Sequence, residues 1–287
     1  MARVVRAAPH VQEVVASPVV KWVGGKTRLL PDLLARIPER FGRYYEPFAG
    51  GAALFFRLAP KRAVLADANH DLIGLYTAIA KDVGAVIRRL EIHREAHSEA
   101  HYYEMRARWN DREVSWSTPE RAAAFIYLNK TCFNGLWRVN RKGEFNVPFG
   151  KYTNPTICDE ENLRAVSLAL QDAVITSLDF EKTTLPAKRG DVAYFDPPYV
   201  PVSATANFTA YTAGGFGFED QVRLRDVAMR LDARGVHVLL SNADVPLVRE
   251  LYKGFRVEEV QAPRRVNSKG GKRGNVGEVL ISGRGAK

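Results

Sequence analysis

The chain contains little cysteine and no long apolar run. Cys132 and Cys158 are the only cysteines among 287 residues, without a CxxC motif or a His/Cys pair at metal-ligand spacing. This excludes a disulfide framework or a structural zinc as the basis of the fold. No apolar run approaches the about 20 residues that span a bilayer, and the first residues lack the apolar core of a secretory signal. We therefore expect a cytoplasmic protein without metal or membrane contact, with a loose tail over residues 1–14.

The chain also contains fewer acidic than basic residues. The chain has 32 Asp and Glu against 42 Lys and Arg, which gives a net charge of +10. Such a balance favours a polyanionic partner, above all nucleic acid, although a solvated basic surface is an alternative. The hydrophobic content of 46% supports a sizeable core and excludes disorder of the whole chain.

The segment "SPVVKWVGGKTRLLPDLLARIP" is the first with a clear pattern. It predicts a short strand, a glycine turn and a helix whose apolar face extends from Leu29 to Ile37. "GGKT" resembles part of a phosphate-binding loop. That interpretation fails because Val20 stands where the motif requires glycine.

Two alternating units follow. "YYEPFAGGAALFFRL" predicts a strand ending near Glu46, a loop at Gly50 and Gly51, and a helix, and "AVLADANHDLIGLYTAIA" predicts a strand closing on Asp67 and a second helix. This order is typical of a nucleoside-cofactor unit, in which glycines allow close approach and the acid accepts ribose hydroxyls. The pattern is not GxGxxG, so a purely structural turn explains the glycines equally well.

The α/β alternation stops over residues 76–155 and resumes afterwards. "AVITSLDFEKT", "GDVAYFDPPYV" and "VHVLLSN" predict further strands, and the C-terminal region predicts two strands joined by the basic loop "NSKGGKRGN". We expect an α/β fold with a Rossmann-like sheet. Residues 15–75 and 156–287 would form the catalytic domain, and residues 76–155 an inserted, mainly helical recognition domain carrying a β-hairpin.

Three histidines of the insertion, His93, His97 and His101, recur at intervals of four residues. They would face one way on a helix. Without cysteines or a paired carboxylate motif nearby, we interpret them as a solvated helix face and not as a metal site.

From about Lys21 to Ile281 the chain closely resembles the Dam family of DNA adenine N6-methyltransferases, which use S-adenosylmethionine. The matching stretches are "KWVGGK", "EPFAGGA", "LADANHDLI", "FNGLWRVNRKGEFNVPFGKY", "DPPY", "SATANFTAY" and "RVNSKGGKRGNVGEVLI". Their order is that of the alpha class. The resemblance implies a monomer that acts on double-stranded DNA and releases S-adenosylhomocysteine.

The "DPPY" stretch, Asp196 to Tyr199, suits methylation of an exocyclic amino group. Such a nitrogen is a poor nucleophile, and two acceptors holding its hydrogens would turn its lone pair toward a methyl donor. Asp196 supplies one acceptor. The Pro197 carbonyl, aimed by the rigid pair with Pro198, supplies the other, and Tyr199 stacks on a base flipped from the duplex. Direct transfer then depends mainly on positioning and needs neither a metal nor a covalent intermediate.

The resemblance also implies the residues that contact the cofactor. Trp22 and Lys26 would contact S-adenosylmethionine, Asp67 its ribose, and Asp179 with Phe180 its adenine. The remaining cofactor positions carried over from the family are Glu46, Phe48, Gly50 and Asp196.

DNA contacts are implied in the same way, on the pattern of the members specific for GATC. Arg138 would read a guanine, because its planar fork matches guanine O6 and N7. Leu136 and Pro148 would meet the thymine methyl, and Phe133 would wedge into the base stack. The other implied contacts are Asn134 at the target pair, Lys21 at the first guanine and Lys151 at a phosphate. The residues themselves suggest one more contact: Lys269, Lys272 and Arg273 on a glycine-rich loop suit a phosphate clamp, and a merely solvated loop is the alternative.

Two alternatives stay open. N4-cytosine methylation uses the same tetrapeptide chemistry, although the motifs outside "DPPY" argue against it. A catalytically silent DNA-binding protein is the other, although Gly50, Asp67, Asp196 and Tyr199 are all present. RNA and protein-amide methyltransferases usually carry Asn at the position of Asp196, which disfavours them.

Overall fold

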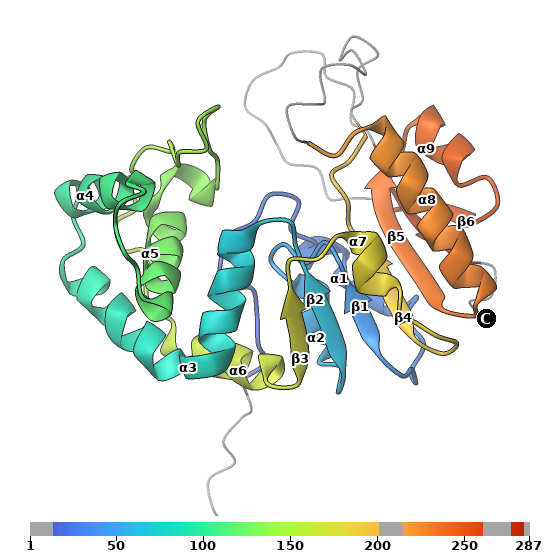
Figure 1. Ribbon diagram of the computed structural model, residues 1–287, viewed down its shortest axis with the longest axis horizontal. Helices are drawn as coiled ribbons and strands as arrows, with labels where there is room; N and C mark the ends of the chain where they lie inside the picture. Colours follow the sequence, from blue (N-terminus) through green and yellow to red (C-terminus); the bar gives the residue numbers. More distant parts are fainter. Residues whose placement is uncertain (1–13, 201–214, 261–276, 284–287) are drawn as a thin grey trace, which may run out of the picture.

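One mixed sheet organises the protein. The computed structural model describes residues 14–200, 215–260 and 277–283, and in this part of the chain the sheet has the order β3-β2-β1-β4-β5-β7-β6 (Figure 1). The first five strands are parallel, and β7 runs antiparallel between β5 and β6. The strands are β1 Tyr44–Glu46, β2 Ala63–Ala66, β3 Ala173–Thr176, β4 Val192–Phe195, β5 His237–Ala243, β6 Arg256–Val260 and β7 Glu278–Ser282. The expected α/β fold is confirmed.

Alternate residues of each central strand pack on opposite faces of the sheet, as the pleat requires. Tyr44 and Tyr194 belong to one core, whereas Tyr45 and Ala193 belong to the other. The first face is covered by α1 (Leu30–Leu34), α2 (Ala53–Leu58) and α3 (His70–Glu95), and the second by α7 (Phe180–Thr184), α8 (Phe218–Ala233) and α9 (Pro246–Leu251). Helices on both faces explain why these strands are almost continuously apolar.

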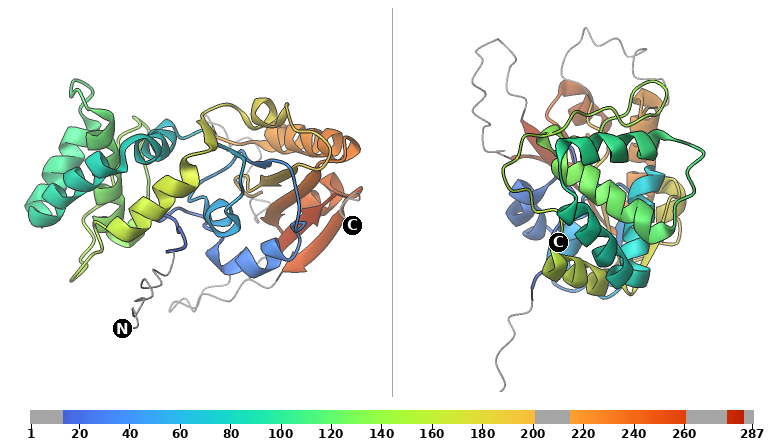
Figure 2. Two further views of the ribbon diagram at one scale, coloured as in Figure 1. Left: turned by 90° about the horizontal axis from the view of Figure 1, so that it is seen from below. Right: turned by 90° about the vertical axis from the view of Figure 1, so that its left-hand side faces the viewer.

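A helical part lies beside the sheet (Figures 1 and 2). It comprises much of α3 with α4 (Glu99–Asn110), α5 (Thr118–Thr131) and the short 3-10 turn η2 (Phe133–Gly135), and α6 (Glu160–Leu170) packs against α3. Leu90 and Phe125 of this part belong to the same core as Tyr44. The predicted boundary between the two domains, after residue 75, lies inside α3, whose backbone is non-helical at Asp82. The division into two domains stays a prediction.

The N-terminal segment differs from its prediction. Residues 14–23 form no strand, because the backbone N–H groups of Ser17 and Lys21 donate to Asn162 Oδ1 at 2.9 Å and Asn129 Oδ1 at 2.8 Å. A 3-10 turn, η1 (Thr27–Leu29), leads into α1, and α1 ends before Ile37. After Leu34 the chain tightens, because Arg36 and Ile37 donate their N–H groups to the carbonyls of Leu33 and Leu34, three residues back.

The interpretation of the histidines as a solvated helix face is wrong. α3 ends at Glu95 and α4 begins at Glu99, so the chain bends between them. His93 Nδ1 lies 3.0 Å from His101 Nε2, and His97 Nδ1 lies 3.1 Å from the Tyr127 hydroxyl. Burial lowers the pKa of His93 to about 4. The imidazoles therefore pack as neutral rings around Tyr127.

Two kinds of feature are absent from the described ranges. None of their helices is both long and apolar enough to cross a membrane. None of their His, Cys, Asp and Glu side chains gather in threes in a way that could hold a metal ion.

Candidate active site

A cleft opens where the strand order reverses. β1 and β4 are neighbours, and their connections leave in opposite directions along the sheet. Ligands of open α/β sheets bind beyond the carboxyl ends of the strands at such a point. Glu46 ends β1 and Asp196 follows β4, and both line a cleft of about 1250 Å³. Asp196 therefore lies at the carboxyl end of β4, as the sequence predicts, and its role in binding stays a prediction.

The carboxylate of Asp196 is held on both oxygens. Lys26 Nζ lies 2.8 Å from Oδ2, and the Ser241 hydroxyl donates to Oδ1 at 2.8 Å. Burial raises the pKa of Asp196, while the Lys26 charge and the two hydrogen bonds oppose this rise. Lys26 and Ser241 thus favour the ionised, acceptor form of a buried carboxyl group.

Lys26 also joins Asp196 to Tyr199. Its ammonium lies 4.8 Å from the centre of the Tyr199 ring, donates to the Gly24 carbonyl at 2.6 Å, and lies 3.7 Å from Glu278 Oε1. The Tyr199 hydroxyl donates to the same Glu278 oxygen. The aromatic ring, the cation and the two carboxylates form one compact group at the floor of the cleft.

Glu46 is the third carboxyl group of the cleft. It is 3% exposed and accepts a hydrogen bond of 2.9 Å from the Tyr44 hydroxyl. Burial raises its pKa to about 8, although the bond from Tyr44 acts in the opposite direction. At neutral pH Glu46 is therefore mostly uncharged and can donate as well as accept a hydrogen bond.

The glycine loop after β1 is fixed by Asp67. Gly50 has a φ of +48° and donates its N–H to Asp67 Oδ2 at 2.9 Å, while Asn69 N–H donates to Oδ1 at 2.9 Å. A Cβ at Gly50 would lie only 2.8 Å from Trp22 Cδ1. The loop therefore requires glycine both for its backbone conformation and for its contact with Trp22.

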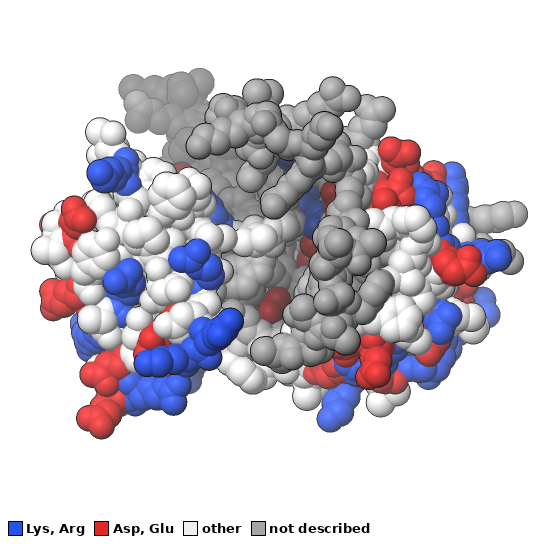
Figure 3. All heavy atoms as spheres, turned by 90° about the horizontal axis from the view of Figure 1, so that it is seen from above, with Lys and Arg blue, Asp and Glu red and all other residues white. Residues whose placement is uncertain are grey.

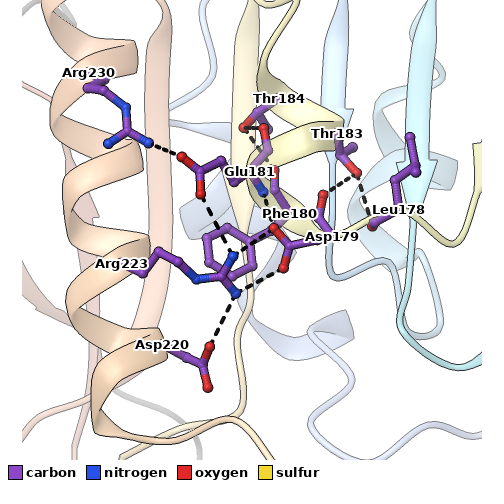
Figure 4. A network of polar contacts seen from close by, with 9 residues as sticks. All are labelled: Leu178, Asp179, Phe180, Glu181, Thr183, Thr184, Asp220, Arg223 and Arg230. Atoms are coloured by element: carbon purple, nitrogen blue, oxygen red, sulfur yellow. Dashed lines mark hydrogen bonds and ion pairs between the residues drawn. The ribbon is translucent and has the colours of Figure 1, made fainter.

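Three predicted cofactor residues lie together outside the cleft lining. The Phe48 and Phe180 rings stack with centres 5.5 Å apart. Arg223 of α8 pairs with both oxygens of Asp179 at 2.9 Å and lies 4.2 Å from the centre of the Phe180 ring (Figure 4). Phe180 is only 4% exposed. In this arrangement Asp179 acts as the N-cap of α7 and as the partner of Arg223.

The predicted DNA residues fall into two groups. Lys21, Phe133, Asn134 and Leu136 line the same cleft as Asp196. Phe133 is 54% exposed, and Asn134 holds a left-handed turn at φ +57°. The structure therefore brings the start of the expected recognition segment to the cleft that Asp196 lines.

Arg138, Pro148 and Lys151 are exposed and do not line the cleft. Arg138 Nε donates to Asn146 Oδ1 at 2.9 Å across a turn closed by a bridge between Val139 and Phe145. Basic and acidic side chains intermingle on the visible surface of both the helical part and the sheet part (Figure 3). Lys269, Lys272 and Arg273 lie outside the described residues.

Four residues that the sequence did not predict form hydrogen bonds to the cleft residues or to the Asp196–Tyr199 turn. Ser241 and Glu278 contact Asp196 and Tyr199, and Gln221 donates to the Pro198 carbonyl at 2.9 Å. Asn129 binds both the N–H and the carbonyl of Lys21, at 2.8 and 2.9 Å. The sequence contained one indication of this: "SN", Ser241 and Asn242, ends the apolar run "VHVLL". Polar residues on a buried strand need hydrogen-bond partners, so this pair could have been predicted to contact the site.

Comparison with known proteins agrees with this geometry. Residues 22–266 match the family described as D12 class N6 adenine-specific DNA methyltransferase. The Type II methyltransferase M1.LlaDCHI of Lactococcus lactis is 44% identical over 93% of this chain and 95% of its own length. The Type II methyltransferase M.MjaIII of Methanocaldococcus jannaschii is 40% identical over 92% and 98%, and the DNA adenine methylase of Escherichia coli K12 is 37% identical over 91% and 93%.

Proposed function

Because the chain belongs to the D12 class of N6 adenine-specific DNA methyltransferases, we propose that it methylates a flipped adenine within GATC, with S-adenosylmethionine as donor. The observation that carries this proposal is the group formed by Asp196, Lys26 and Tyr199 at the carboxyl end of β4. A buried carboxylate acceptor beside an aromatic ring matches the needs of an exocyclic amino group on a planar base. We expect the enzyme to act as a monomer on double-stranded DNA.

The cleft fits the proposed cofactor. Its volume of about 1250 Å³ exceeds the usual range of about 300–1000 Å³ for small-molecule sites, which leaves room for a base as well. Trp22 and Gly50 form a close-packed wall, and uncharged Glu46 can offer a hydrogen-bond donor or acceptor. Trp22, Lys26, Glu46 and Gly50 would therefore hold S-adenosylmethionine. When bound, this cofactor supplies a methyl group on a positively charged sulfur.

The protein's own residues orient the nucleophile. Asp196 and the Pro197 carbonyl would accept the two hydrogens of the adenine N6 amino group, which leaves the lone pair of N6 directed at the methyl carbon. N6 would form its new bond to the methyl carbon as the carbon–sulfur bond breaks, with the bonding pair staying on sulfur. The proton that N6 then loses would pass to Asp196 Oδ2, which already accepts that hydrogen. Tyr199 would hold the base by stacking, its hydroxyl anchored on Glu278.

A direct assay tests the proposal. The protein is incubated with S-adenosylmethionine labelled in its methyl group and with unmethylated plasmid, and the modified base is identified by mass spectrometry and located by single-molecule sequencing. N6-methyladenine at GATC is expected. N4-methylcytosine would reassign the target base, N6-methyladenine in another motif would reject the site alone, and DNA binding without label transfer would favour a silent protein.

A further inference from the structure

A buried layer of polar side chains lies behind the Asp196–Tyr199 turn. Ser241 and Asn242 are 0% exposed at the end of β5, and Gln221 of α8 is 3% exposed. Burying such groups is unfavourable unless their hydrogen bonds are made. Ser241 and Gln221 each form a hydrogen bond to the turn, and Asn242 forms one to Gln221. These polar side chains are therefore buried in order to hold the turn.

The contact with Ser241 follows from the strand register. Phe195 of β4 pairs with Leu240 of β5, which brings the next residues, Asp196 and Ser241, side by side. Ser241 donates its one proton to Asp196 Oδ1 at 2.8 Å. The Tyr194 hydroxyl, 3.1 Å from Ser241 Oγ, must then be the donor to Ser241. A directed chain of hydrogen bonds therefore runs from Tyr194 through Ser241 to the catalytic carboxylate.

Gln221 and Asn242 hold the other end of the turn. Gln221 Nε2 donates to the Pro198 carbonyl at 2.9 Å, and Asn242 Nδ2 donates to Gln221 Oε1 at 3.2 Å. Asn242 Oδ1 accepts from the Val200 N–H at 3.3 Å. The Pro197 carbonyl accepts no hydrogen bond from the described residues.

We infer that Ser241 and Gln221 are positioning residues: Ser241 fixes Asp196 Oδ1 and Gln221 occupies the Pro198 carbonyl. The second lone pair of Asp196 Oδ2, beside the one that faces Lys26, and the Pro197 carbonyl then remain for the amino group of the base. This inference rests on the proposed methyl transfer. Lys26 meets Oδ2 from the cleft side, whereas Ser241 approaches from within the sheet. The two partners therefore have different tasks: Lys26 would share Oδ2 with the amino group, whereas Ser241 binds Oδ1 alone and leaves Oδ2 to them.

Single-turnover methylation of an unmethylated GATC duplex, at saturating S-adenosylmethionine, tests the inference. Ser241→Ala should slow the methylation step by about 10²-fold through misplacement of the acceptor, with the dissociation constants of cofactor and duplex unchanged. The acid limb of the rate profile should also move to higher pH, because the Ser241 bond lowers the pKa of Asp196. Loss of folded protein would lower the amplitude without moving this limb.

Further variants keep the test decisive if Ser241→Ala folds poorly. Tyr194→Phe, which removes only the first donor of the chain, should shift the limb in the same direction by a smaller amount. Gln221→Met should slow the step without moving the limb. The controls are Ser167→Ala, Tyr252→Phe and Gln171→Met, whose side chains lie elsewhere.

The outcomes separate the inference from the proposed function. An inactive wild-type protein would overturn both. An active wild type whose Ser241→Ala and Tyr194→Phe variants keep the normal rate and pH profile would overturn the inference alone. The expected slowing and shift, absent from the three controls, would support it.

Discussion

The Lys26 ammonium lies 2.8 Å from Asp196 Oδ2 and is itself only 8% exposed. The two residues come from distant parts of the sequence: the turn before η1 and the end of β4. An ion pair removed from water gains stability only when its remaining hydrogen-bonding groups also find partners. Here Gly24 and Ser241 supply those partners. The pair therefore favours the ionised form of a buried carboxyl group, which is the form that the proposed acceptor role needs.

Replacing Lys26 should make activity depend on pH. Burial already raises the pKa of Asp196, and Lys26→Met removes the charge that opposes this rise. We expect the rate at pH 7 to fall and then to recover as pH increases, since each unit of pKa above the assay pH lowers the ionised fraction about tenfold. Single-turnover rates from pH 6 to 10 at saturating cofactor measure this. Lys26→Arg, which keeps the charge, is the matched control, and parallel profiles for the two variants would contradict the explanation.

Asp196→Ala should abolish methyl transfer while leaving the fold and most nonspecific DNA affinity intact. The variant would lose the proposed acceptor of the amino group, and misplacement of reacting groups costs about 10²-fold or more. Its melting temperature should fall although the protein still folds, because the loss of the Asp196 carboxylate leaves the buried Lys26 ammonium with Glu278, at 3.7 Å, as its carboxylate partner. Methylation and duplex-binding assays beside the exposed control Asp172→Ala check both statements. Full activity of Asp196→Ala would reject the mechanism.

Glu46 should make the fold less stable as pH rises. Its pKa is raised from 4.5 to about 8, so between these values the folded state binds more protons than the unfolded state, and the free energy of unfolding decreases with increasing pH. Glu46→Gln removes this dependence. We expect the variant to gain stability over the wild type between pH 6 and pH 9, by at most a few kcal/mol. Urea unfolding of both proteins at each pH measures the difference. If the free energy of unfolding changes with pH equally in the two proteins, Glu46 is not the cause of the pH dependence.

The sequence predicted the part of the site that is determined by residues close together along the chain. A strand end at Glu46, a glycine at position 50 and an acid after the next strand are features of short range, and the structure places them as expected. The contacts of Asp196 with Ser241, Lys26 and Glu278 depend on strand order. The antiparallel insertion of β7 brings Glu278 beside Tyr199, and no local pattern indicates that insertion.

The histidines illustrate the same limit. Their spacing of four residues fits one helix face, but the chain bends after Glu95, and only tertiary packing against Tyr127 decides where the rings lie. The strand expected before Gly24 failed for a related reason. Asn129 and Asn162, far along the chain, bind the backbone that a neighbouring strand would otherwise have paired.

Arg138 offers the sharpest test of sequence choice. Asn146 holds its Nε at 2.9 Å, while its two terminal nitrogens make no hydrogen bond to the described residues. The guanidinium is thus oriented by the turn, with its fork available for guanine O6 and N7. Arg138→Ala should cost about 1–3 kcal/mol of discrimination at that guanine and relax specificity there more than it weakens overall binding.

Single-molecule sequencing of DNA modified by the wild type and by Arg138→Ala measures the preference at each position of the site. Arg141→Ala is the control, because Arg141 is an exposed arginine of the same turn that is not expected to read a base. We expect the control to keep the wild-type preference, with at most a uniform loss of rate from weaker attraction to phosphates. An undiminished preference for guanine in Arg138→Ala would assign the reading of that base to another side chain.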